Sequence, residues 1–105
     1  MTRRTTKPTR RRCIWDKTDG RCAHCGRAVK GRNRTIDHFI PKSQGGTYDR
    51  RNLMPLCRIC NHDRGSMTIE PEEYYIFAPE EAIKECIEYR DEFDGARRNM
   101  NGEIV

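Results

Sequence analysis

The sequence of 105 residues is poor in apolar side chains. Hydrophobic residues make up 34% and charged residues 35% of it, against about 45–50% apolar (glycine included) and about 25% charged in globular domains. No stretch approaches the roughly 20 consecutive apolar residues of a membrane span. The segment Met1–Arg4 begins no apolar run typical of a secretory leader. We therefore expect one small domain with a thin core, no membrane association and a reducing, cytoplasmic setting.

Cysteine, by contrast, is plentiful. Six are present, and four of them form two Cys-x-x-Cys pairs: Cys22, Cys25, Cys57 and Cys60. Two such pairs predict one tetrahedral Zn²⁺ held by four thiolates, and a four-thiolate iron site is the chemical alternative. Zinc binding is worth roughly 10–16 kcal/mol in zinc-finger peptides, which offsets a thin core. Cys13 and Cys86 are interpreted as small, partly buried hydrophobic residues.

Basic and acidic residues are distributed unevenly along the chain. Residues 1–67 hold 17 Lys and Arg against 5 Asp and Glu, a net charge of +12, whereas residues 68–105 hold 4 against 11, a net charge of −7. Four zinc-bound thiolates would remove about two charges and leave the first part strongly basic. Such an excess favours a polyanionic partner. The alternative is charge that only faces solvent.

These changes in charge and composition divide the chain into three segments. Residues 1–8 are polar and basic and are interpreted as a disordered arm. Residues 9–67 contain the cysteine pairs, and residues 68–105 form an acidic extension. Within the middle segment, capping and β-branched residues predict four elements: a helix from Arg10 to about Lys17 capped by Thr9, strands over Thr35–Ile40 and Asn52–Leu56, and a helix from Arg58 to about Arg64 that stops at Gly65.

The acidic extension is predicted to be helical. Its helix should start at Ala78-Pro79-Glu80-Glu81, where proline and carboxylates suit a first turn. One face of the helix carries apolar residues at helical spacing: Ala82, Ile83, Cys86, Ile87, Tyr89 and Phe93. We expect this face to pack on the zinc-bearing domain, with a frayed tail after Asp94-Gly95. The alternative is a face that binds a larger protein partner or a second copy of the chain.

Between the cysteine pairs lies a set of residues suited to catalysis. Asp37 directly precedes His38, and Asn61 directly follows Cys60. A carboxylate and an amide carbonyl are hard ligands that suit Mg²⁺ or Mn²⁺, and an imidazole that titrates near neutrality can act as a base. Successive strand side chains point to opposite faces. Asp37 and His38 can therefore serve one site only if the strand bends or twists there.

The order of these residues resembles that of a known family. It runs Cys22-x-x-Cys25, Asp37-His38-x-x-Pro41, Gly45-Gly46, Asn52-Leu53-x-Pro55-Leu56-Cys57-x-x-Cys60-Asn61. This run, within about Trp15 to Gly65, resembles the zinc-bearing HNH endonucleases, whose motif is called ββα-metal. The resemblance implies a small α+β fold, a ββα-metal motif stapled by a four-cysteine zinc site, with flanking helices. It also implies a metal-dependent DNA endonuclease or nickase.

The resemblance further implies a role for individual residues. His38 would be the general base, and Asp37 and Asn61 would hold a catalytic Mg²⁺ or Mn²⁺, with Ni²⁺ or Zn²⁺ as further options. Asn52 would hold the His38 loop by hydrogen bonds. His62 is an additional candidate metal ligand or leaving-group donor. Candidate DNA phosphate contacts are Arg64, Arg10, Arg11, Arg12 and Lys42.

Two non-enzymatic alternatives fit the same pattern. A zinc-ribbon module could bind nucleic acid through the basic surface without a second metal. Such a module would need the cysteines but neither His38 nor Asn61. An assembly component could instead use the acidic helix to dock on a larger machine.

Overall fold

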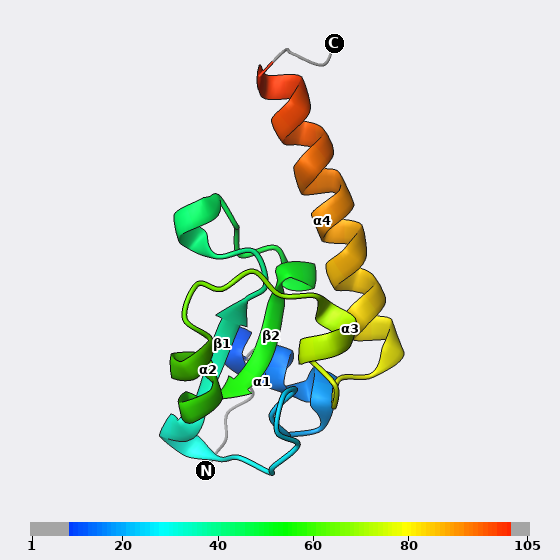
Figure 1. The fold of residues 1–105 in the computed structure, drawn as a ribbon. Coiled ribbons are helices and arrows are strands. Elements are labelled where there is room, and N and C mark those ends of the chain that lie inside the picture. The colour runs from blue at the N-terminus through cyan, green and yellow to red at the C-terminus, as the bar shows by residue number, and fades with distance from the viewer. Residues whose placement is uncertain (1–8, 102–105) are drawn as a thin grey trace.

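The computed structural model describes residues 9–101, with side chains placed for residues 9–96. The disordered arm predicted over residues 1–8 lies outside this range. Figure 1 shows a small α+β body from which one long helix projects toward the C-terminus. The helices and strands are α1 (Arg10–Trp15), β1 (Arg34–His38), β2 (Leu53–Cys57), α2 (Arg58–Arg64), α3 (Pro71–Tyr74) and α4 (Glu80–Asn101).

A two-stranded antiparallel sheet followed by a helix forms the centre of the body. Strand β1 pairs with β2 from Arg34 opposite Cys57 to His38 opposite Leu53, and every residue of β2 is buried. Helix α2 follows β2 directly, because the Cys57 sulfur caps it by accepting a hydrogen bond from the Cys60 amide. The predicted α+β class with a ββα unit is therefore confirmed.

Helix α1 covers one side of this unit. The Thr9 hydroxyl caps it by accepting a hydrogen bond from the Arg12 amide at 3.1 Å. The α-helix ends at Trp15, shorter than predicted, because residues 16–18 tighten into a 3₁₀ turn. The Trp15 ring is fully buried, and its indole nitrogen donates to the Thr35 carbonyl at 2.8 Å. Helix α1 is thereby fixed to β1.

Segments far apart in sequence meet in one small core. It combines Trp15 with Met54 and Leu56 of β2, and it includes three of the paired cysteines, Cys22, Cys57 and Cys60. Tyr75, Ala82 and Cys86 complete it from the C-terminal part of the chain. The core therefore depends on both the cysteine pairs and the acidic extension.

The extension differs from the prediction in two respects. Helix α3 was not predicted, although Pro71 at its first turn followed by Glu72 and Glu73 is a recognisable helix start. Helix α4 continues through Gly95 to Asn101 instead of fraying after that glycine. Gly95 does not adopt the positive φ with which glycine ends a helix. Its cost of about 1 kcal/mol relative to alanine is too small to stop a long helix.

The N-terminal half of α4 lies against the body (Figure 1). Ala82, Cys86 and Tyr89 are buried there. Ion pairs join the helix to three other segments: Glu85 with Lys17 at 3.7 Å, Glu92 with Arg51 at 2.9 Å and Arg90 with Glu70 at 3.1 Å. Within the described residues, no helix has the length and apolar character needed to span a bilayer.

Candidate active site

Four thiols gather at the end of the β-hairpin. The sulfur atoms of Cys22, Cys25, Cys57 and Cys60 all lie within 4.8 Å of one another. Tetrahedral Zn²⁺ with Zn–S bonds of about 2.3 Å requires sulfurs about 3.8 Å apart. The donor set and its spacing therefore fit a four-thiolate metal ion. All four positions of the ion would be filled, which makes this site structural.

Backbone amides donate hydrogen bonds to the sulfur atoms of this cluster, and such bonds stabilise thiolates. The Cys22 sulfur accepts hydrogen bonds from the amides of Cys25 at 3.5 Å and Cys57 at 3.3 Å. Gly26 closes the first knuckle with a φ of +77°, and a Cβ atom there would lie 2.8 Å from the Phe77 ring. Only glycine fits that position. His24, inside the knuckle, bonds the Tyr74 carbonyl through Nδ1 at 2.8 Å and stacks on the Tyr74 ring.

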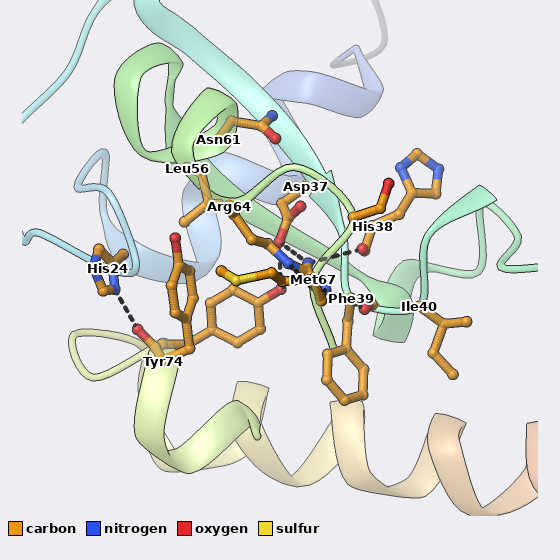
Figure 2. Close-up of polar contacts among 12 residues, drawn as sticks. His24, Asp37, His38, Phe39, Ile40, Leu56, Asn61, Arg64, Met67 and Tyr74 are labelled. Carbon is orange, nitrogen blue, oxygen red and sulfur yellow. Dashed lines mark hydrogen bonds and ion pairs between the residues drawn. The ribbon is translucent and has the colours of Figure 1, made fainter. Parts of the chain in front are cut away.

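A second site forms where β1 ends. A surface pocket of about 170 Å³ is lined by Asp37, His38 and Asn61, together with Ile36, Pro41, Lys42 and Gly65. The chain turns out of the strand after His38, and Arg64 holds this bend through the carbonyls of His38 at 3.0 Å and Phe39 at 2.8 Å. Figure 2 shows the Arg64 guanidinium bonded to Asp37 and to the His38 carbonyl. Asp37 and His38 therefore border one pocket despite being neighbours on a strand.

The Asp37 carboxylate is held from inside the protein. Its side chain is 4% exposed, and its Oδ2 accepts hydrogen bonds from the Arg64 guanidinium and the Tyr75 hydroxyl, both at 2.5 Å. Burial raises the pKa of Asp37, while the Arg64 charge and the two hydrogen bonds act in the opposite direction. No hydrogen bond from the described part of the chain ends on Oδ1. This oxygen is available as a hard ligand.

Arg64 does not fit its expected role. It is 1% exposed, and its nitrogens donate to Asp37 and to the carbonyls of His38, Phe39 and Met67. A buried guanidinium with this many internal acceptors is unable to reach a DNA phosphate. The expectation of a phosphate contact from Arg64 is therefore wrong. The residue is a structural cation beneath the pocket.

His38 combines partial burial with a cationic surrounding. Its ring meets Tyr48 edge to face, with centroids 4.7 Å apart, and its buried Nε2 has no hydrogen-bond partner among the described residues. Desolvation lowers the pKa of His38, and the charges of Lys42 and Arg10 lower it further. The imidazole is therefore neutral at pH 7 and able to accept a proton.

Asn61, on α2, is oriented by the strand opposite. Its Nδ2 donates to the Thr35 hydroxyl at 2.8 Å and lies 3.4 Å from the Ile36 carbonyl. The Thr35 hydroxyl in turn donates to the Leu56 carbonyl at 2.7 Å, so it accepts from Asn61. The Asn61 side-chain oxygen accepts no hydrogen bond from the described residues, and Asn61 lines the pocket.

Asn52 is fully buried behind the loop that follows His38. Its Oδ1 accepts from the Ile40 amide at 2.7 Å, and its Nδ2 donates to the carbonyls of Ile40 at 3.2 Å and Thr47 at 3.0 Å. Gly46 packs so closely that a Cβ atom there would lie 1.7 Å from the Ile40 oxygen. Asn52 therefore closes the 40–47 loop and does not reach the pocket.

The remaining candidates occupy different surfaces. Arg10 lies 4.5 Å above the Tyr48 ring, and Lys42 donates to the Tyr48 hydroxyl at 2.8 Å, so both flank His38. Arg11 and Arg12 are exposed and line a separate hollow of about 260 Å³ with Thr9, Gly31 and Arg34. His62 is exposed and is absent from the described lining of the Asp37 pocket.

Two residues at the site were not predicted from the sequence. Tyr48 packs on His38, yet it follows a glycine-rich loop and belongs to no periodic pattern. Tyr75 bonds Asp37 from 38 positions away, although Pro71-Glu72-Glu73 indicates a short helix just before it. Nothing in the local sequence signals either contact.

The fold and the two sites define a ββα unit joined to a four-cysteine cluster that fits a metal ion, with a histidine at the end of its first strand. Residues 22–66 match the family model of the HNH endonuclease. The chain is similar to the CRISPR-associated endonuclease Cas9 of Corynebacterium diphtheriae, with 39% identity over 46 residues. These residues are 43% of this chain and 4% of Cas9, so the chain spans a small part of that relative's length. No solved structure matches the chain.

Proposed function

We propose that this protein is a metal-dependent DNA endonuclease or nickase that hydrolyses phosphodiester bonds at the Asp37 pocket. The observation that carries the proposal is the meeting of a carboxylate, an amide and a neutral imidazole around one pocket. The match of residues 22–66 to the HNH endonuclease family model supports it. The four-cysteine cluster holds a structural zinc in this proposal and takes no part in the reaction.

The proposed catalytic ion is Mg²⁺ or Mn²⁺, held by Asp37 Oδ1 and Asn61 Oδ1. Both are hard oxygens of residues that line the same pocket, and in both side chains the other polar atom is bound to protein. When bound, such an ion supplies charge stabilisation to a phosphate and its leaving oxygen. Ni²⁺ or Zn²⁺ could replace it. His62 is a weaker candidate because it is exposed and is not part of the pocket lining.

His38 is the proposed general base. An imidazole that is neutral at pH 7 accepts a proton from an attacking water, and its Nε2 is buried. Nδ1 is therefore the nitrogen that we assign to this proton transfer. Lys42 and Arg10 flank the ring and give this side of the pocket positive charge, which suits a phosphate.

DNA is the proposed polyanion. The net charge of +12 over residues 1–67 supports this assignment. Arg11 and Arg12 would extend the phosphate-binding surface from the His38 side of the body across α1. These contacts meet the DNA backbone and carry no sequence information directly.

Supercoiled plasmid tests the proposal. Zinc-loaded protein is incubated with the plasmid and Mg²⁺, Mn²⁺ or Ni²⁺, and nicked and linear products are resolved on a gel. We expect cleavage by the wild type and a loss of at least about 100-fold in His38→Ala, the scale of general base catalysis. Exposed Lys84→Ala on α4 is the control, and His62→Ala tests the weaker candidate ligand separately. Uncut plasmid together with salt-sensitive DNA binding would instead indicate a zinc-ribbon binding module.

A further inference from the structure

We propose that Tyr75 is a positioning residue for Asp37, holding Oδ2 so that Oδ1 stays turned toward the metal pocket. This inference rests on the proposed function, because it assigns a purpose to the orientation of Asp37. Tyr75 lies in the acidic extension, beyond residues 22–66 that match the nuclease family. In this proposal, the acidic extension contributes a positioning residue to the site.

The hydrogen bonds of Asp37 are the first observation that supports this inference. Only one of its two carboxylate oxygens receives hydrogen bonds within the described chain, and that oxygen receives both, from Tyr75 and Arg64. Tyr75 also accepts from Arg64 at 3.2 Å, so the three side chains form a closed triangle. Tyr75 is 1% and Arg64 1% exposed. Because Tyr75 and Arg64 are buried, neither has solvent as an alternative partner, and their two contacts to Oδ2 fix the rotation of the carboxylate.

The second observation is that the segment containing Tyr75 is bound to the first cysteine knuckle. The segment Tyr74–Phe77 is tied to the first cysteine knuckle, because the Tyr74 carbonyl accepts from His24 at 2.8 Å and the Phe77 amide donates to Ala23 at 2.8 Å. The Tyr74 hydroxyl also donates to the Cys60 carbonyl at 3.3 Å. Figure 2 shows the stacked rings of His24 and Tyr74 at this junction. Tyr75 is therefore placed by the zinc-binding frame.

Together these contacts connect the structural metal site to the candidate catalytic carboxylate. Cysteine ligation fixes the knuckle, the knuckle fixes the segment, and Tyr75 on that segment fixes Asp37. Residues that orient a metal ligand typically change metal affinity or activity by about 10- to 100-fold when they are removed. We expect the lower end of this range for Tyr75, because Arg64 remains on the same oxygen.

Tyr75→Phe tests the inference because it removes only the hydroxyl. Mn²⁺ binding is measured by electron paramagnetic resonance on zinc-loaded, DNA-free protein in a His38→Ala background. The expected result is an approximately ten-fold weaker Mn²⁺ affinity, with unchanged zinc content. Exposed Ile76→Val is the matched control, because it changes the neighbouring side chain on the same segment and leaves the contacts that place Tyr75 intact; its affinity should stay within two-fold.

The outcomes separate this inference from the proposed function. Absence of Mn²⁺ binding in the His38→Ala parent would overturn the proposed metal site itself. An affinity of Tyr75→Phe equal to that of the parent would overturn only the role of Tyr75. If Tyr75→Phe does not fold, 3-fluorotyrosine is placed at position 75 in the His38→Ala chain. Mg²⁺ should then shift its ¹⁹F resonance, and a resonance that does not move would refute the inference.

Discussion

Asn52 binds both backbone polar groups of Ile40, because its side chain accepts from the Ile40 amide at 2.7 Å and donates to the Ile40 carbonyl at 3.2 Å. This pairing closes the loop after His38 while the side chain of Asn52 remains fully buried. Aspartate at position 52 has nearly the same shape but no hydrogen to donate. It would also place a negative charge against two carbonyl oxygens.

We therefore predict that Asn52→Asp destabilises the protein by about 1–3 kcal/mol, the cost of unsatisfied buried polar groups. Urea unfolding of zinc-loaded protein measures this change. Plasmid cleavage should fall with it, because the loop that positions His38 loosens. Exposed Asn33→Asp is the control. Equal unfolding midpoints for the two variants would show that the Asn52 hydrogen bonds contribute little.

A second prediction concerns the orientation of Asn61. Thr35→Val keeps the shape of the side chain but removes the oxygen that accepts from Asn61 at 2.8 Å. The amide is then free to rotate, so we expect a several-fold higher Mn²⁺ concentration for half-maximal cleavage. Asn61→Ala should have a larger effect, since it removes the proposed ligand itself. A metal dependence identical to wild type in Thr35→Val would argue against this orienting role.

A third prediction follows from the cations near His38. Desolvation, Lys42 and Arg10 all lower the pKa of His38. The neutral, basic form therefore persists to a lower pH, and the acid limb of cleavage should lie below the ordinary histidine value of about 6.5. Lys42→Met removes one lowering charge, so its acid limb should move to higher pH. The measurement is cleavage rate against pH at saturating metal.

The position of the limb, and not the overall rate, is the informative quantity for Lys42→Met. Lys42 is also a candidate phosphate contact, so the rate at every pH should decrease. Lys84→Met removes an exposed charge from α4 and serves as the control. Should both variants keep the wild-type limb, another group would control the acid side of the profile.

The sequence predicted those features that depend on near neighbours. Helix α2 begins after Cys57 and ends before Gly65 as expected, because its cap and its stop are local signals. The four cysteines specified their cluster through spacing alone. Asn61 directly follows Cys60, so the cluster places it near β1, where it contacts Thr35. For this reason the sequence could predict that Asn61 and Asp37 belong to one site.

The features that the sequence did not predict depend on distant segments. Arg64 is typical of an exposed phosphate contact when only its neighbours are considered. It is buried because Asp37 and Tyr75, at separations of 27 and 11 residues, converge on it. The bend after His38 likewise depends on distant residues. Arg64 binds the carbonyls of His38 and Phe39, and Asn52 binds the backbone of Ile40. No periodicity in the strand itself encodes these contacts.

A fourth prediction tests the zinc frame. Cys57 supplies a proposed metal ligand and also caps α2, so Cys57→Ser should lose both zinc and cooperative unfolding. Cys13→Ser is the control, because Cys13 lies on α1 outside the cluster. Metal analysis should find one tightly bound zinc per chain in wild type and in the control. A Cys57→Ser protein with wild-type zinc content and unfolding would contradict the four-thiolate site.

A final prediction concerns the acidic extension. Truncation after Met67 removes Tyr75, Ala82 and Cys86 from the core and leaves the buried Asp37 and Arg64 open to water. We expect the truncated chain to lose its folded state even with zinc, as judged by circular dichroism and thermal unfolding. A chain ending at Ala96 is the control, since the contacts between α4 and the body described above are made before that residue. A truncated chain that unfolds cooperatively and cleaves plasmid would show that the extension is dispensable and free to serve a partner.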